Sequence, residues 1–224
     1  MSLFRIVMLV IAAGFVSACS TPHSTMRNAS PTDASLPASA QEAAQQSAQV
    51  AFMPNASINS ITVDVPNSLT VSEANSYFPR GDIVWRGDIF GDRHEQVKTI
   101  IERSAAQLKQ SLTGTRPVDL HIRVTRFHGL SEKARYSTGG VHNINFILTV
   151  TDPATGVILR GPKTVVSNLS AFGGKEALAA DQRGETQKMR VTGFITQVLK
   201  AELTTPGGHV DTEGGFFVAL NRQR

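Results

Sequence analysis

Three segments in the second half of the chain alternate apolar and polar side chains, and this period of two constrains the fold more than any other feature. The first begins at Asp119, the second at Asn143, and the third covers about residues 157–169. The apolar positions of the first two are Leu120, Ile122 and Val124, then Ile144, Phe146, Leu148 and Val150. One apolar and one polar face per strand is typical of an antiparallel sheet covered on a single side.

Two further segments have the spacing of three and four residues that indicates amphipathic helices. The first is predicted to begin at Asp92, which caps the first turn with Glu95 three residues on, and to end at Gly114. The second covers about residues 175–203, with a kink or break at Gly184. Their apolar positions are Val97, Ile100, Ile101, Ala105, Leu108 and Leu112, then Val191, Phe194, Ile195, Val198 and Leu199.

Two shorter strands are predicted ahead of the first helix. Ile61, Val63 and Val65 alternate with polar residues, and residues 82–86 form a second candidate. With the three longer strands they make a sheet of about four to five strands. We therefore expect an α+β fold, a two-layer sandwich in which two helices cover one face of an antiparallel sheet.

The N-terminal part of the chain indicates export. Residues 1–18 have a basic residue (Arg5), an apolar run of about 11 residues and then Ser17 and Ala18, which are the parts of a signal peptide. The run is shorter than the roughly 20 residues that span a bilayer. Residues 19–57 are rich in Ser, Ala, Pro and Gln and are predicted to be a flexible linker.

The remaining chain suits one domain and a tail. Residues 58–204 are long enough for a single α+β domain with its own core, expected in the periplasm. Residues 205–224 form a glycine-rich C-terminal tail, in which residues 216–220 are predicted to add a short edge strand or to dock elsewhere. The formal net charge of +4 would tolerate anionic neighbours, but no basic run with interleaved aromatic residues indicates nucleic acid.

Cys19 is the only cysteine of the chain and directly follows Val16, Ser17 and Ala18. This tetrapeptide resembles the lipobox of bacterial lipoproteins. The resemblance implies a diacylglyceryl group on Cys19 and anchoring to a lipid bilayer, which two or more acyl chains make stable. Ser20 resembles the residue that directs such proteins to the outer membrane, in the inner leaflet and facing the periplasm; the inner membrane is the alternative. An incidental cysteine in an ordinary signal peptide is the other interpretation.

Four polar residues gather around a predicted strand connection: His128, Arg135, Tyr136 and His142. We interpret them as a possible partner or ligand surface, against the simpler interpretation of a solvated hairpin. Two histidines without a third ligand do not indicate zinc. Trp85 is a further candidate for this surface, together with Ile89 and Phe90, or else belongs to the core.

The sequence gives little support to catalysis. A G-x-S-x-G elbow and a reactive cysteine are both missing, and Asp119 and His121 share a strand face without a serine partner. A periplasmic hydrolase would have to use His121, His128 or His142. Neither the acidic residues near the first helix nor the glycines at 173–174 match a metal or phosphate motif. We expect no catalytic residue, no metal and no cofactor.

Residues 82–88, 91–94, 126–146 and 184–188 resemble a family of uncharacterised alphaproteobacterial lipoproteins. That resemblance implies a lipoprotein and adds no catalytic residue. We expect a non-enzymatic protein that acts by contact with an envelope protein in envelope assembly or transport. The alternative is a binding module for an anionic envelope lipid or glycan.

Cys19→Ala tests the anchor. Wild-type chain is expected to sediment with membranes after cell fractionation, whereas the variant should appear in the soluble fraction because it lacks the acyl chains. Extraction with detergent, but not with high salt, should release the wild type. Equal membrane association of both forms would contradict the lipid anchor.

Overall fold

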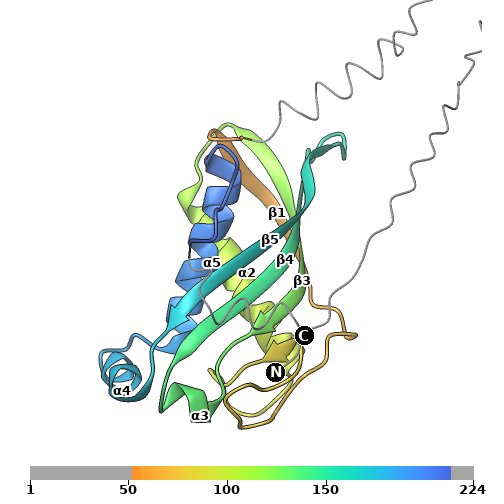
Figure 1. Ribbon diagram of the computed structural model, residues 1–224. Coiled ribbons are helices and arrows are strands. Elements are labelled where there is room, and N and C mark those ends of the chain that lie inside the picture. Colours follow the sequence, from red (N-terminus) through yellow and green to blue (C-terminus); the bar gives the residue numbers. More distant parts are fainter. Residues whose placement is uncertain (1–51, 213–224) are drawn as a thin grey trace, which may run out of the picture. The chain divides into compact units, whose positions relative to one another are not determined.

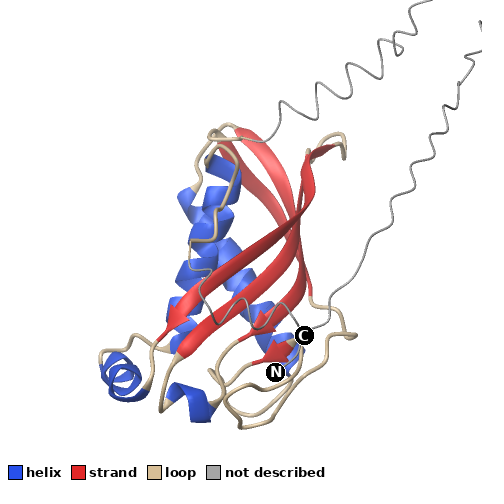
Figure 2. Ribbon diagram, viewed as in Figure 1, coloured by secondary structure: helices blue, strands red, loops and turns tan. Residues whose placement is uncertain are grey.

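The computed structural model describes residues 52–212, which form an α+β domain (Figures 1 and 2). The predicted leader, Cys19, most of the linker and residues 216–220 lie outside this range. Five strands and four helices follow one another along the chain: β1 (Ala56–Asp64), β2 (Ile83–Val84), α2 (Arg93–Ser111), β3 (Arg116–His128), α3 (Glu132–Arg135), β4 (Gly140–Thr151), β5 (Ile158–Ala171), α4 (Gly174–Gln182) and α5 (Gln187–Thr204).

The five strands form one mixed sheet in the order β1-β3-β4-β5, with β2 paired to the last two residues of β3. The α+β class is confirmed, and β3, β4 and β5 are antiparallel as predicted. β1 and β2 instead run parallel to β3. The reason is the connection: α2 carries the chain back along the sheet before β3 begins, and such a crossover places the two strands it joins in the same direction.

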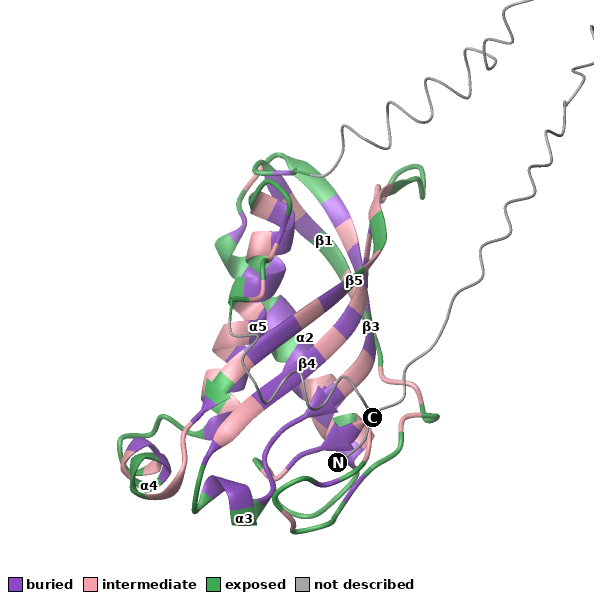
Figure 3. Cartoon of the chain, viewed as in Figure 1, coloured by how far each residue is buried: buried purple, intermediate pink, exposed green. Residues whose placement is uncertain are grey.

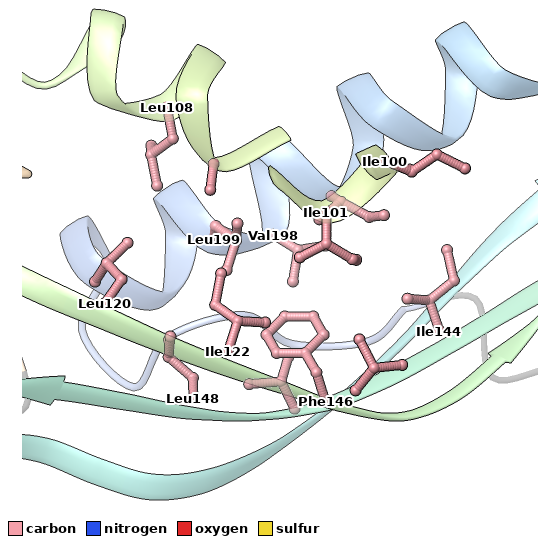
Figure 4. Close-up of a cluster of buried hydrophobic side chains, with 14 of the residues drawn as sticks. Ile100, Ile101, Leu108, Leu120, Ile122, Ile144, Phe146, Leu148, Val198 and Leu199 are labelled. Atoms are coloured by element: carbon pink, nitrogen blue, oxygen red, sulfur yellow. The ribbon is translucent and has the colours of Figure 1, made fainter. Parts of the chain in front are cut away.

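The core lies between one face of the sheet and a layer made by α2 and α5 (Figure 4). Ile101 of α2 and Val198 and Leu199 of α5 point toward the sheet. The side chains opposite them come from β3 and β4 and include Leu120, Ile122, Ile144, Phe146 and Leu148, which are all buried. Both predicted helical faces and both predicted strand faces therefore meet in this core.

The helix boundaries follow from local signals in the sequence. The Asp92 carboxylate caps α2 by accepting hydrogen bonds from the backbone N–H groups of His94 (2.9 Å) and Glu95 (3.2 Å). The second predicted helix is two helices, α4 and α5. They are separated at Gly184, which has a φ of +79°. Glycine adopts this backbone conformation without steric strain because it lacks a Cβ atom.

Ordered chain extends past both ends of the predicted domain. Met53 is buried, and its backbone N–H donates to the Leu203 carbonyl (2.8 Å), so the chain packs against α5 before β1 begins. After α5 the chain turns back along β5. There the Lys163 ammonium donates to the Gly207 carbonyl (3.2 Å), and the Asn168 amide donates to the Asp211 carboxylate. Within residues 52–212, no helix has the length and apolar character needed to cross a membrane.

Glu202 is a fully buried carboxylate near the end of α5. Its oxygens accept hydrogen bonds from the Arg160 guanidinium (2.8 Å), the Lys163 ammonium (2.8 Å) and the His209 backbone N–H (3.0 Å). A buried charge is tolerated only when it is paired in this way. Glu202 therefore connects α5, β5 and the segment that follows α5.

Glu202→Ala should lower the free energy of unfolding by about 3 kcal/mol, because it removes the buried carboxylate that pairs with Arg160 and Lys163. Urea denaturation followed by circular dichroism measures the loss. Glu185→Ala is the matched control: its ion pair with Arg183 is on the surface and should leave the midpoint almost unchanged. Equal effects of the two substitutions would contradict the role of the buried pair.

Candidate functional site

A cleft of about 620 Å³ lies at the end of the sheet beside α3. Its walls come from parts of the chain that are distant in sequence: residues 77–79, the end of β3 with the loop after it, α3, the start of β4 and the end of β5. Many of the lining side chains are apolar, among them Phe78, Leu130, Val141 and Ala171. A cleft of this size and lining is typical of sites that bind a small ligand or a few side chains of a partner.

Two glycines allow neighbouring segments to pack closely in the wall of the cleft. Gly129 follows β3 directly, and a Cβ there would lie 2.9 Å from the Val84 carbonyl oxygen and 3.3 Å from the Trp85 ring. Gly139 precedes β4 with a φ of +71°, and a Cβ there would lie 2.6 Å from the Ala171 carbonyl oxygen. At both positions a side chain would clash with a neighbouring backbone carbonyl, so glycine is what allows these segments to approach each other.

One rim of the cleft is attached to α3 by Ser131. Its hydroxyl accepts a hydrogen bond from the Ala134 backbone N–H (3.1 Å), which caps α3, and donates to the Ser76 carbonyl (2.6 Å). The Lys133 backbone N–H donates to the Asn75 side chain (2.7 Å). These bonds hold the loop that carries Tyr77 and Phe78 against the helix. Figure 3 shows buried residues of α3 next to the exposed loops around it.

Arg135 does not form part of an open surface, which corrects the expectation from the sequence. The residue is buried. Its guanidinium donates two hydrogen bonds to the Asp181 carboxylate of α4 (2.7 and 2.8 Å) and one to the Gln187 amide oxygen of α5 (3.0 Å). Arg135 is buried because these partners surround it. The neighbouring Tyr136 is about half exposed and lies outside the cleft lining.

Of the predicted site residues that the structure describes, only His128 lines the cleft. Its Nδ1 atom lies 2.7 Å from Nη2 of Arg126. Burial, and next the charge of Arg126, lower the pKa of His128 to about 4. The ring is therefore neutral near pH 7 and accepts the hydrogen bond from the guanidinium.

His142 is buried on the core face of β4, next to Ile144 in the alternating pattern, which again corrects the expected surface position. Burial, followed by the charges of Arg190 and Arg135, lowers the pKa of His142 to about 3. Neither ring nitrogen has a hydrogen-bond partner in the described part of the chain.

The three histidines proposed for a hydrolase do not come together. His121 is exposed and pairs with Thr149 on β4. It lies seven residues before His128 on the same strand, a separation of roughly 23 Å at the usual rise of a strand.

Trp85 is fully buried and therefore belongs to the core rather than to an exposed partner surface. Its ring packs edge-on against Phe127 at a centroid distance of 5.4 Å. The indole N–H donates to the Asp88 carboxylate (2.8 Å), whose other oxygen accepts from the Lys188 ammonium of α5 (2.6 Å). Ile89 and Phe90 beside it are more than four-fifths exposed, as the sequence suggested.

The acidic residues near α2 have structural partners. The Asp82 carboxylate accepts from the Thr70 backbone N–H (2.9 Å) and hydroxyl (2.7 Å), and these bonds lower its pKa. Asp88 and Asp92 have the partners given above. Among residues 52–212, no cluster of three or more potential ligand side chains is placed to hold a metal ion.

The aromatic rim of the cleft, formed by Tyr77 and Phe78, was not predicted from the sequence. Tyr77 is 44% exposed and Phe78 is 62% exposed, although both are large apolar side chains. The Lys133 ammonium lies 4.7 Å from the centre of the Tyr77 ring. The signal that would have found them is two adjacent aromatic residues before Pro79, in a segment with neither helical nor strand period.

The buried His142 predicts a pH dependence. As the pH falls below about 6.5, the unfolded chain protonates this histidine while the folded chain keeps it neutral down to about 3, so stability is lost. At about pH 5 this loss is about 2 kcal/mol. His142→Leu should reduce the difference in unfolding free energy between about pH 7.5 and pH 5 by that amount, leaving the part due to His128. Urea denaturation at both pH values measures it, and an unchanged difference would refute the assignment.

Some solved structures share a distant likeness with the chain. A variant of the PelC dodecamer from Paraburkholderia phytofirmans is 10% identical, with 70% of this chain and 92% of that chain covered and a TM-score of 0.32. An uncharacterised protein is 14% identical, with 67% and 95% covered and a TM-score of 0.29. At these TM-scores neither likeness supports a statement about this chain.

No curated protein matches the chain. A family model does match, over residues 56–219, and so covers every helix and strand of the α+β domain, the cleft and part of the tail. The expectation of an uncharacterised family is confirmed at that level: the chain belongs to DUF6778, a family of unknown function.

Proposed function

We propose that this chain is a lipid-anchored protein that faces the periplasm and acts, without catalysis, by protein–protein contact in envelope assembly or transport. The cleft beside α3 is the contact site in this proposal. The observation that carries it is the combination of an apolar cleft with exposed aromatic side chains on its rim. Aromatic side chains next to a preformed hollow are the features that dominate binding energy in protein interfaces.

The rim is already organised for binding. The bonds of Ser131 and Lys133 to the segment before Tyr77 fix the loop against α3, so little conformational entropy remains to be lost when a partner docks. Phe78 is 62% exposed and offers a large apolar area to a partner. An apolar segment of a partner protein, inserted between Phe78 and the start of β4, fits this geometry.

The chemistry of the site supports binding rather than turnover. His128 is neutral near pH 7 and accepts a hydrogen bond from Arg126, while His142 is buried in the core. Nucleophilic catalysis would need a hydroxyl within about 3 Å of a base. Ser131, one of the two serines in the lining, instead uses its hydroxyl to cap α3 and to donate to the Ser76 carbonyl.

The lipid anchor in this proposal rests on the sequence around Cys19. A single acylated cysteine at the start of the mature chain would keep the domain at the membrane surface. The preferred location is the inner leaflet of the outer membrane, with the cleft open to periplasmic partners.

A second candidate is the binding of an anionic envelope lipid or glycan. The position of the Lys133 ammonium over the Tyr77 ring favours it, because this pair places a cation beside an aromatic platform at the rim of the cleft. Such binding would weaken as the salt concentration rises.

Photo-crosslinking in the native cell tests the proposal. A photoreactive phenylalanine analogue replaces Phe78 in the cleft rim or, as a matched control, Val157 in the turn before β5, which is 58% exposed. We expect a discrete protein adduct from position 78 and not from position 157. Adding Tyr77→Asp should remove that adduct, because a carboxylate would be desolvated in the apolar contact.

The kind of adduct separates the two candidates. A protein adduct that is sensitive to Tyr77→Asp supports the contact hypothesis. An adduct with lipid or glycan, weakened by salt, would support the second candidate instead. Equal adducts from positions 78 and 157 would contradict a role for the cleft in either.

A further inference from the structure

The chain after α5 runs along β5 in the direction of that strand. Gly207 contacts Lys163, and four residues later Asp211 contacts Asn168, so the tail advances toward the cleft as β5 does. Three further contacts fix this course: the Lys163 and His209 bonds to Glu202, and the edge-on packing of the His209 ring against Phe194, with ring centres 6.2 Å apart.

Continuing this course leads to the cleft. Asn168 pairs with Asn143 across the sheet, and the next pair with the same orientation is Ser170 with Val141, both of which line the cleft. Two residues of a strand span about 7 Å. Asp211 therefore lies within one short step of the cleft, and the 12 residues from 213 to 224 follow it.

The composition of that remaining segment suits the cleft. Gly214 and Gly215 are followed by Phe216, Phe217, Val218, Ala219 and Leu220, the most apolar run after α5. Five residues beyond Asp211 can extend about 16 Å, which is more than the step to the cleft requires. The family model ends at residue 219, so it includes most of this run with the domain.

We propose that residues 216–220 occupy the apolar cleft of the same molecule, between the Phe78 rim and the start of β4. Phe216 and Phe217 would cover apolar surface of Phe78 and Val141 that is otherwise exposed. The occupancy itself depends only on the cleft and the course of the tail. Its consequence rests on the proposed function: the tail would be a built-in competitor that leaves the cleft when a partner binds.

Cysteine pairs in the purified full-length chain test the occupancy. Cys19→Ser first removes the only native thiol. Ala219→Cys is then combined with Val141→Cys in the cleft or with Thr149→Cys as the matched control. Both β4 positions are partly exposed and lie on the same face of the strand, eight residues or roughly 27 Å apart. We expect an intramolecular disulfide with position 141 at least about tenfold faster than with position 149, as a tenfold higher local concentration would give.

Adding Phe216→Asp and Phe217→Asp to the 141–219 pair should remove this preference, because charged side chains do not enter an apolar cleft. Equal rates at the two β4 positions would overturn the proposal. Crosslinks between molecules in place of those within one molecule would also overturn it, in favour of a second copy as the occupant.

The failure of this inference is distinguishable from failure of the proposed function. In cells, the photo-crosslink from position 78 is compared between the full chain and a chain that ends at Thr212. If the tail fills the cleft nine-tenths of the time, its removal should raise the apparent affinity for a partner about tenfold. A partner adduct that is unchanged by truncation would refute the competitor while leaving the contact site intact. A disulfide preference for position 141 without any partner adduct would support occupancy and refute the contact function.

Discussion

β3 is the strand on which the rest of the structure depends, because it alone in the described sheet pairs with three other strands. It pairs with β4 over most of its residues, with β1 along its first half and with β2 at its end. Parallel pairing with β1 requires the α2 crossover, and this crossover places α2 on the face where Leu120 and Ile122 point. α5 buries its own apolar face beside α2, in the same core against the sheet.

The cleft follows from the same arrangement. β1 stops pairing with β3 at Arg123, and β2 supplies only two residues at Phe127 and His128. Irregular chain therefore covers the last part of β3 on that side, and its loops close over the end of the sheet together with α3. Loops held by a rigid sheet are where binding sites commonly form. The glycines at 129 and 139 keep the backbone of neighbouring segments close together without filling the space between them.

Periodicity predicted the parts of the fold that are set locally. The alternation at residues 120–124 and 144–150, the cap at Asp92 and the break at Gly184 each depend on neighbours within a few positions. The parallel direction of β1 was not predicted, because it depends on which strand lies beside it rather than on its own pattern. The burial of Arg135 was missed for the same reason: its partners Asp181 and Gln187 lie about 50 residues further along the chain. Tyr77 and Phe78 lie in a segment without helical or strand periodicity, so the sequence pattern did not predict the aromatic rim.

α5 connects the two regions that the functional argument uses. Near its first turn, Gln187 bonds to Arg135 of α3, and Lys188 bonds to Asp88, which accepts the Trp85 indole N–H. Near its last turn, Glu202 bonds to β5 and to the start of the tail. Buried charge pairs of this kind contribute little net stability against an apolar alternative, but a wrong position of the helix would leave a charge unpaired. The charges thus select one register of α5 against the sheet. In that register the α3 side of the cleft and the start of the tail are held by one helix, so their separation is fixed by the fold.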